Sequence, residues 1–171
     1  MKNTKYNSGI TMIELIIYIA IMGIVMAIVV QLMSGSFAVF AQARAKQGLL
    51  SAGSSSIERI TYNIRNAESF SGSNNTFDAN PGSLSVIVND VNNVTHTYTY
   101  AIVDSRLTEQ IDNGTINYMT GPNQVVTNFT VQQITANSKS GAVITIEIAD
   151  NRVSPASHAI FKTATLMRGT Y

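Results

Sequence analysis

The chain has 171 residues, which suits one ordinary domain with an extension. Its formal net charge is +1 and only 12% of its residues are charged, so binding of nucleic acid through bulk positive charge is not expected. The absence of Cys excludes disulfides, thiolate chemistry and zinc sites built on Cys, so core packing and hydrogen bonds must stabilise the fold.

The chain begins with a short polar stretch and continues as a long apolar segment. Residues 1–8 carry Lys2 and Lys5 as their only charges, and residues 10–33 are almost entirely apolar. As a helix, the apolar segment would extend roughly 36 Å, enough to cross a bilayer core of about 30 Å. Lysines ahead of such a segment predict a cytoplasmic N-terminus, so the remainder of the chain is expected outside the cytoplasm.

Residues 15–43 contain no Lys, Arg, Asp or Glu, so Glu14 is the one charged residue at the start of the apolar segment. Three interpretations of the segment differ in how they account for this carboxylate. A cleaved secretory signal with a cut near Ala41-Gln42-Ala43 would need an apolar run of about 7–15 residues, roughly half the length present. A plain membrane anchor has the right length but no use for a carboxylate, which costs about 2.5–3.5 kcal/mol at the helix centre and less near the interface. The third interpretation is that processing and assembly give Glu14 a partner.

The residues around Glu14 resemble the class III signal of type IV pilins and pseudopilins. The match consists of a short lysine-bearing leader, Gly9, the sequence ITMIE at residues 10–14 and an apolar run of membrane length. The resemblance implies that the prepilin peptidase cuts between Gly9 and Ile10 and that Ile10 is then N-methylated. Glu14 becomes the fifth residue of the mature chain, where this family places its acid. Ile10 and Met12 replace the family's usual Phe and Leu, and the Pro common in its apolar segment is absent.

Cleavage after Gly9 would give Glu14 a counter-ion. The new amine at Ile10 would be largely cationic at neutral pH. In a bundle of subunits, Glu14 can pair with the Ile10 amine of a neighbour. The pair adds little net stability, but breaking it leaves an uncompensated charge and costs about 3–5 kcal/mol, so it selects one axial offset between subunits. Glu14 also falls in the first helical turn, where the macrodipole favours an anion.

The helix is predicted to continue beyond the membrane as far as Phe70. Residues 37–50 are rich in helix formers, and residues 57–67 place Ile and Ala at steps of three and four, which gives one apolar face. Gly48 and the Gly-Ser stretch at residues 53–56 are positions where the helix can bend. The polar, Gly- and Asn-rich stretch that follows ends the helix.

From residue 83 onward the pattern changes to short strands. Asp112-Asn113-Gly114 contains Asn-Gly, a strong hairpin signal. We expect an α+β, pilin-like fold with a leader (1–9), a long N-terminal helix (10–70, of which 10–33 crosses the membrane) and a globular domain (77–171). In that domain one antiparallel sheet of about six or seven strands packs against the helix. The strands are predicted at residues 84–89, 96–103, 105–111, 115–119, 124–135, 142–149 and 159–168.

The side chains that carry chemistry form no catalytic or metal-binding pattern in the sequence. His96 and His158 have no acid at ligand spacing and are interpreted as residues of strand surfaces. Five acids fall in or near predicted loops, where Ca²⁺ would find suitable ligands, but their spacing is not that of an EF-hand. We therefore predict no catalytic residue, no cofactor and no bound metal, and do not expect an enzyme. The five acids are Asp78, Asp90, Asp104, Glu109 and Asp112.

The resemblance implies a minor pilin or pseudopilin, a structural subunit of a type IV pilus-like or type II secretion filament. Residues 57–67 and the last predicted strand are similar to J-type minor pseudopilins. The implied partners are the prepilin peptidase, other pilin or pseudopilin subunits that contact the N-terminal helix, and the inner membrane, which the chain crosses once before it enters an extracytoplasmic filament. Two alternatives stay open: a membrane-anchored extracytoplasmic binding domain that does not polymerise, and an enzyme secreted by cleavage near Ala43.

Overall fold

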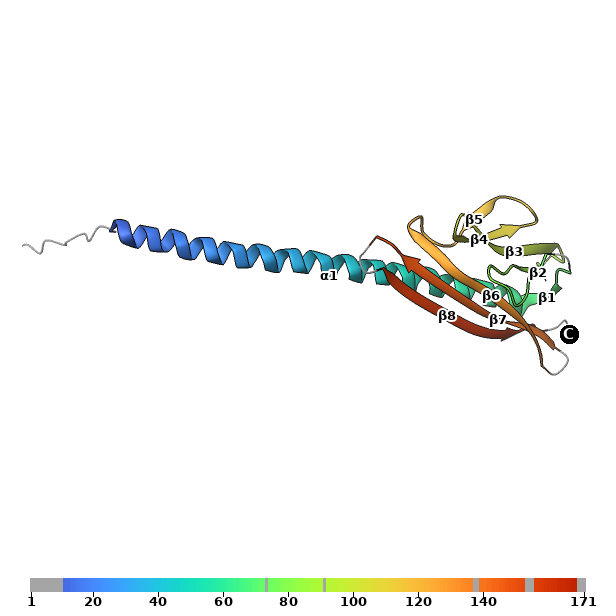
Figure 1. Ribbon diagram of the computed structural model, residues 1–171. Coiled ribbons are helices and arrows are strands. Elements are labelled where there is room, and N and C mark those ends of the chain that lie inside the picture. Colours follow the sequence, from blue (N-terminus) through green and yellow to red (C-terminus); the bar gives the residue numbers. More distant parts are fainter. Residues whose placement is uncertain (1–10, 73, 91, 137–138, 153–155, 169–171) are drawn as a thin grey trace, which may run out of the picture. The chain divides into compact units, whose positions relative to one another are not determined.

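The computed structural model describes residues 11–72, 74–90, 92–136, 139–152 and 156–168. The chain divides into two compact units, Met1–Ala41 and Gln42–Tyr171, and each is described by itself. One long helix, α1 (Met12–Asn66), contributes to both units and is followed, within these residues, by eight strands (Figure 1). The fold is α+β, as predicted, with a long N-terminal helix packed against antiparallel β-sheets.

α1 is a single helix of 55 residues, and the glycines along it do not interrupt it. In the second unit the helix buries one face, whose members recur at steps of three and four residues. This face is longer than the one predicted at residues 57–67, because its first buried member is Ala45. Its buried members are Ala45, Leu49, Gly53, Ser56, Ile60, Asn63 and Ile64.

α1 ends at Asn66, whereas the sequence predicts helix as far as Phe70. The residues between them form a short strand, β1 (Ala67–Phe70), which pairs antiparallel with β2 (Leu84–Asn89). Ala67 is buried in the core of the unit. Helix propensity is a weak preference, and here backbone pairing with β2 and the burial of Ala67 outweigh it.

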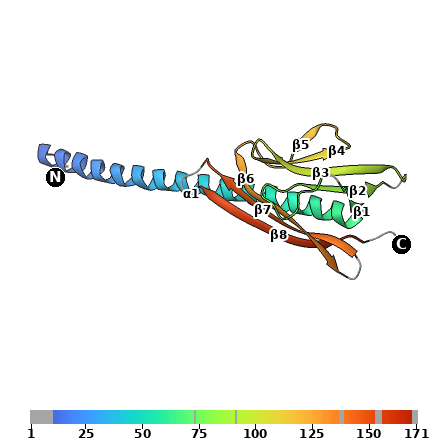
Figure 2. The same cartoon turned by 45° about the vertical axis from the view of Figure 1, so that its right-hand side comes forward.

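The strands form two antiparallel sheets rather than the single sheet predicted. The first has the order β1-β2-β3-β4-β5 and the second the order β6-β7-β8 (Figures 1 and 2). Periodicity in a sequence identifies strands but does not say which strands pair, and this is why the division between β5 and β6 was missed. The remaining bounds are β3 (Thr95–Val103), β4 (Arg106–Ile111), β5 (Ile116–Tyr118), β6 (Gln124–Ala136), β7 (Lys139–Asp150) and β8 (Ser157–Leu166).

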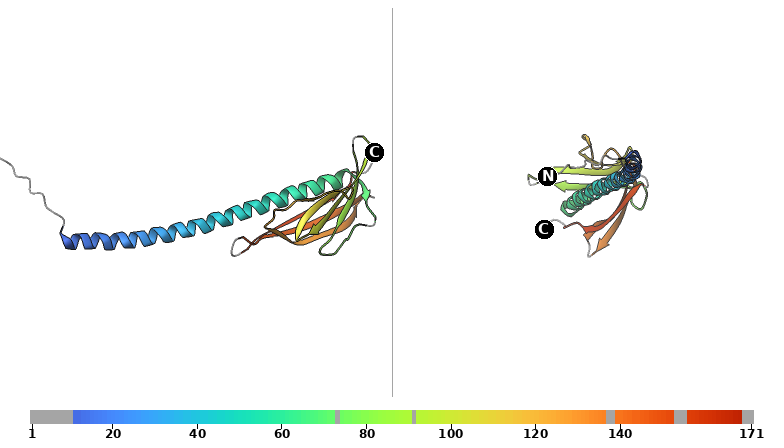
Figure 3. Two further views of the ribbon diagram at one scale, coloured as in Figure 1. Left: turned by 90° about the horizontal axis from the view of Figure 1, so that it is seen from above. Right: turned by 90° about the vertical axis from the view of Figure 1, so that its left-hand side faces the viewer.

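The second half of α1 lies against both sheets (Figure 3). The apolar side chains of the helix and of the two sheets form one core. Burial of this apolar surface is the main source of stability of the second unit. The large side chains that are fully buried are Leu49, Ile60 and Ile64 from α1, Leu84, Val86, Tyr100 and Leu107 from the first sheet, and Phe129, Val131, Ile144, Ile146 and Ile148 from the second.

Two of the described hairpins turn through a pair of successive non-glycine residues that both have positive φ. Between β4 and β5, Asp112 and Asn113 have φ of 49° and 57°, and the Gly114 N–H donates to the Ile111 carbonyl at 2.8 Å. Two successive central residues with positive φ are the pattern of a type I′ turn. The predicted hairpin is therefore confirmed, although its central pair is Asp112-Asn113 rather than Asn113-Gly114. Asp104-Ser105, between β3 and β4, has the same signs of φ.

The sequence suggested that Glu109 lies in or near a loop. In the structure, Glu109 is instead a buried residue of β4. Its side chain is 3% exposed; Arg59 Nε of α1 donates to its Oε1 at 2.7 Å, and the Tyr100 hydroxyl donates to the same atom at 2.9 Å. Asn63 Nδ2 in turn donates to the Tyr100 hydroxyl. Burial, together with the nearby Glu109 carboxylate, raises the pKa of Tyr100, which keeps its hydroxyl protonated. The network satisfies the buried carboxylate and joins α1 to the first sheet.

Gly53 allows the second sheet to approach α1 closely. A Cβ placed on Gly53 would lie 2.0 Å from the ring of Phe161 in β8, well inside van der Waals contact. At Gly48, five residues earlier on the same helix, the nearest atom to an added Cβ is Gln124 Nε2 at 3.5 Å, an ordinary contact. The two glycines therefore differ in packing although both are helical.

We predict that Gly53→Ala lowers the free energy of unfolding of the second unit by about 1–3 kcal/mol, because Phe161 must move to admit the methyl group. Gly48→Ala is the matched control and should raise it by up to about 1 kcal/mol, since alanine favours the helix and meets no obstacle. Denaturant unfolding of the full chain in detergent micelles, followed by near-ultraviolet circular dichroism of the tyrosines, measures both. Equal effects of the two changes would contradict the packing described.

Candidate functional site

The first unit contains an apolar helical segment whose side chains are exposed on every side. Every residue from Thr11 to Arg44 is exposed, with Met12 85%, Met22 67% and Phe40 68% exposed. Among the described residues, α1 is the one helix long and apolar enough to cross a membrane, and no part of its most apolar window is buried. A helix that is apolar all round and uncovered needs lipid or apolar partners on its surface.

The polar side chains within this segment bond back to their own helix. Ser34 Oγ donates to the Val30 carbonyl at 2.9 Å, and Ser36 Oγ donates to the Leu32 carbonyl at 3.0 Å. Bonds of this kind satisfy a hydroxyl without any partner from outside the helix. The segment is therefore suited to surroundings in which water is not available.

The start of α1 has the geometry of a helix cap. Thr11 precedes the first helical residue, and its carbonyl accepts from the Leu15 N–H at 3.2 Å. Its hydroxyl oxygen accepts from the Glu14 N–H at 3.4 Å. Thr at the N-cap with Glu three residues later is the pattern of a capping box. Sequence reasoning selected Glu14 but missed Thr11, although the spacing T-x-x-E is visible in the sequence.

Glu14 lies in the first turn of α1, as predicted, and its carboxylate keeps most of its capacity to accept hydrogen bonds. The residue is exposed, and the Tyr18 hydroxyl donates to its Oε1 at 3.4 Å, near the limit for a hydrogen bond. In the described part of the chain no cationic nitrogen lies within 4.0 Å of this carboxylate. Tyr18 occupies the next helical turn, so the two side chains share one face of the helix.

Gly9 and Ile10, the residues predicted to flank the cleavage, lie outside the described residues. The pairing of Glu14 with an amine at Ile10 therefore stays a prediction. Thr11, the first described residue, follows Ile10 directly and is fixed by its bonds to Glu14 and Leu15. A cationic amine at Ile10 would be attached directly to this cap.

His96 and Asp112 form an exposed pair in the second unit, whereas the sequence suggested that His96 has no acidic neighbour. Nδ1 of His96 lies 2.6 Å from Oδ2 of Asp112, and the Thr97 N–H donates to Oδ1 of Asp112 at 2.7 Å. The bonds from His96 and Thr97 hold the pKa of Asp112 below its ordinary value. The pair was missed because antiparallel pairing of β3 with β4 brings together residues that are 16 positions apart.

The other candidate groups do not gather into a metal-binding or catalytic set. Across the described ranges, no three side chains among His, Asp and Glu come close enough to hold a metal ion. Glu109 is already paired with Arg59, and Asp112 with His96. His158 is an exposed residue of β8. The arrangement of these groups gives no support to a calcium site formed by the loop acids.

Residues 4–30 match the family model of the prokaryotic N-terminal methylation motif. The matched segment contains the junction between Gly9 and Ile10, the Thr11 cap and Glu14. No curated protein and no solved structure shows significant similarity to the chain. The match and the exposed apolar helix fit a chain with a single N-terminal membrane anchor.

Proposed function

Because residues 4–30 carry the signature of type IV pilins and prepilins, we propose that the chain is a structural subunit of a type IV pilus-like or type II secretion filament. The observation that carries the proposal is the exposed apolar surface of α1 with a single carboxylate, Glu14, at its head. Lipid covers this surface while the subunit is in the inner membrane, and the helices of neighbouring subunits cover it in the filament. The chain acts by assembly and catalyses no reaction.

Processing by the prepilin peptidase prepares the subunit for assembly. Lys2 and Lys5 hold the N-terminus in the cytoplasm, and cleavage between Gly9 and Ile10 removes them with the leader. The new N-terminal amine belongs to Ile10, which is then methylated and which directly precedes the capping residue Thr11 in the sequence. The second unit lies outside the cytoplasm and forms the surface of the filament.

Glu14 sets the axial position of each subunit against its neighbour. Its carboxylate pairs with the Ile10 amine of an adjacent subunit, and other offsets leave both charges unpaired among apolar side chains. The Thr11 cap supports this role, because it fixes the first turn from which the Glu14 side chain extends. The pair therefore contributes selection of one arrangement more than net stability.

The subunit is best interpreted as a minor pilin or pseudopilin. This assignment rests on the similarity of residues 57–67 and of the C-terminal strand to J-type minor pseudopilins. Recovery of the neighbouring subunits after cross-linking in cells would identify the filament to which the chain belongs.

We predict that the chain isolated from cells with an active prepilin peptidase begins at Ile10 and carries one added methyl group at that residue. Mass spectrometry of the intact chain and of its N-terminal peptide measures both changes, and cells without the peptidase provide the control. An intact Met1 in the presence of the peptidase would contradict the proposal. A mature chain beginning at Arg44 would instead indicate a secreted protein cut after Ala43.

We predict that Glu14→Gln reduces incorporation into sheared filaments at least tenfold, because the Ile10 amine of the neighbour is left without its counter-ion. Immunoblots of filament and membrane fractions measure incorporation, and the amount of processed chain in the membrane should not change.

Glu58→Gln is the matched control for that change, since it removes an exposed acid from the same helix but in the second unit. This variant should assemble like the wild type. Equal incorporation of Glu14→Gln and the wild type would contradict the role of Glu14, and absence of both chains from the filaments would favour a membrane-anchored binding domain that does not polymerise.

A further inference from the structure

Strand β8 (Ser157–Leu166) lies at one edge of the second sheet, whose order is β6-β7-β8. One side of β8 pairs with β7, and no described strand lies beside its other side. β8 is ten residues long, so its open side is long for an edge strand. An open edge presents a row of unpaired N–H and C=O groups that another chain can pair with.

The pairing with β7 determines which backbone groups of β8 point to the open edge. The Met167 N–H donates to the Ser140 carbonyl at 2.9 Å, and these two residues follow the register of β7 and β8. In an antiparallel ladder, pairs that bond each other alternate with pairs that do not. The odd-numbered residues of β8 therefore bond to β7, and the even-numbered residues direct their N–H and C=O groups away from it. These outward residues are His158, Ile160, Lys162, Ala164 and Leu166.

Arg168 continues this alternation just beyond the strand. Its N–H donates to the Arg65 carbonyl at the end of α1, at 3.1 Å. Within the described part of the chain, none of the five outward N–H groups of β8 makes a comparable bond. The edge is therefore satisfied at its C-terminal end and open along the strand itself.

The burial of side chains agrees that this edge is open. All five outward residues are exposed, and Ile160 is 67% exposed. The residues that alternate with them from Ser157 to Thr163 are only half-buried. In the neighbouring strand β7, by contrast, Ile144 and Ile146 are completely buried. No described element covers β8 as β8 covers β7.

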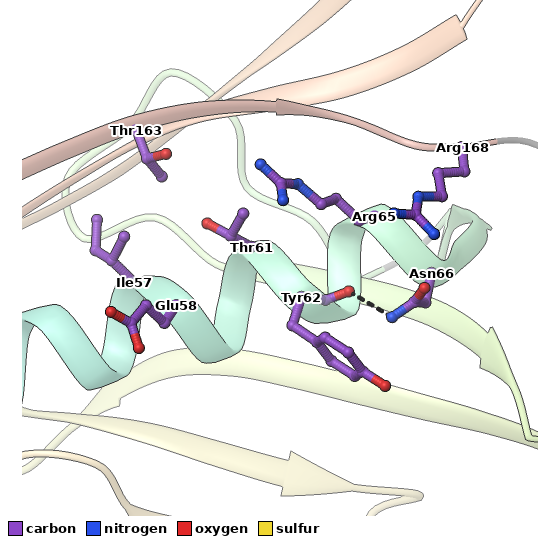
Figure 4. A pocket seen from close by; sticks show the side chains of 8 residues that line it. All are labelled: Ile57, Glu58, Thr61, Tyr62, Arg65, Asn66, Thr163 and Arg168. Atoms are coloured by element: carbon purple, nitrogen blue, oxygen red, sulfur yellow. Dashed lines mark hydrogen bonds between the residues drawn. The ribbon is translucent and has the colours of Figure 1, made fainter.

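A groove of about 450 Å³ lies between β8 and the last turns of α1, within the second unit (Figure 4). Thr163 lines it from β8 and Ile57 lines it from the helix, and Figure 4 shows these two side chains directed toward each other. Neighbouring strands of a sheet lie about 4.8 Å apart. A strand added beside β8 would continue the face that carries Thr163 and would place alternate side chains in this groove.

The charges along the edge favour an acidic partner. Arg65 and Arg168 line the groove, and Lys162 is exposed on the opposite face of β8. Glu58 is the one acid among the described residues that line the groove, and its Oε1 accepts from Ser54 Oγ at 3.2 Å. Opposite charges on neighbouring strands stabilise their pairing, whereas like charges oppose it. Lys162 therefore also disfavours the pairing of β8 with a second copy of itself.

We propose that the open edge of β8 binds an extended, acidic segment of another protein as a further strand of the second sheet. Hydrogen bonds between the two backbones hold the segment, and its alternate side chains select it. Small or apolar side chains would enter the groove beside Ile57 and Thr163, and acidic side chains would lie beside Lys162 on the other face. Such binding does not depend on the filament role proposed above.

A synthetic peptide of about eight residues that alternates Val and Glu is a suitable probe, because it has the length of a strand and acidic side chains on one face. Titration of the isotope-labelled full chain, in micelles of an uncharged detergent, is followed by NMR of the backbone amides. The amides of Ile160, Lys162 and Ala164 should shift saturably and should exchange with solvent more slowly, because the peptide accepts hydrogen bonds from them.

Ala164→Pro should weaken peptide binding at least about tenfold, because it removes an N–H that points to the open edge and makes no bond to β7. Ala164→Val is the matched control, since it changes the same exposed side chain but keeps the N–H; it should bind the peptide like the wild type. Near-ultraviolet circular dichroism verifies that each variant is folded.

Lys162→Glu tests the preference for acidic partners without any change to the backbone. It should weaken binding of the Val-Glu peptide at least about threefold and favour a peptide that alternates Val and Lys. Absence of saturable shifts in the wild type, or equal binding by Ala164→Pro and Ala164→Val, would overturn the proposal. Shifts of the same amides that depend on protein concentration without peptide would instead assign the edge to a second copy of the chain. Because the titration requires no filament, its failure would leave the assembly role of Glu14 untouched.

Discussion

The exposed apolar surface of α1 from Met12 to Phe40 constrains every other feature of the N-terminal unit. Such a surface has to be covered by lipid or by other helices, and in those surroundings an unpaired polar group costs free energy. The sequence meets this constraint in three ways. Ser34 and Ser36 bond to their own helix, charges are excluded from residues 15–43, and the one carboxylate stands in the first turn. Under the proposed function, processing after Gly9 supplies a partner for Glu14 at this position.

The second unit uses the same helix in a different way. There α1 is one wall of a core, and each feature along it fixes a neighbouring sheet. Gly53 admits Phe161 of the second sheet, while Arg59 and Asn63 join the first sheet through Glu109 and Tyr100. Because a buried carboxylate is stable only when it is paired, Glu109 specifies one placement of the first sheet against the helix. One continuous helix therefore presents an exposed apolar surface in its first part and contributes to a folded core in its second.

The sequence was sufficient to predict the α+β class, the position of Glu14 in the first turn and the hairpin at residues 112–114, because these depend on local patterns. It was not sufficient for features that depend on strand pairing. The helix ends at Asn66 since Ala67–Phe70 pair with β2, and Glu109 is buried since β4 faces Arg59. The pair of His96 and Asp112 also exists only because β3 and β4 are neighbours. The Thr11 cap, by contrast, was visible in the spacing T-x-x-E and was overlooked.

The central claim is that the carboxylate of Glu14 contacts the N-terminal amine of a different subunit. Solid-state NMR on filaments assembled from two pools of subunits, one labelled with ¹⁵N at the Ile10 amine and the other with ¹³C at the Glu14 carboxylate, measures that contact directly. The account predicts a dipolar coupling between the pools that corresponds to an ion pair, within about 4 Å. A coupling that appears only when both labels are on the same subunit, or none at all, would contradict it.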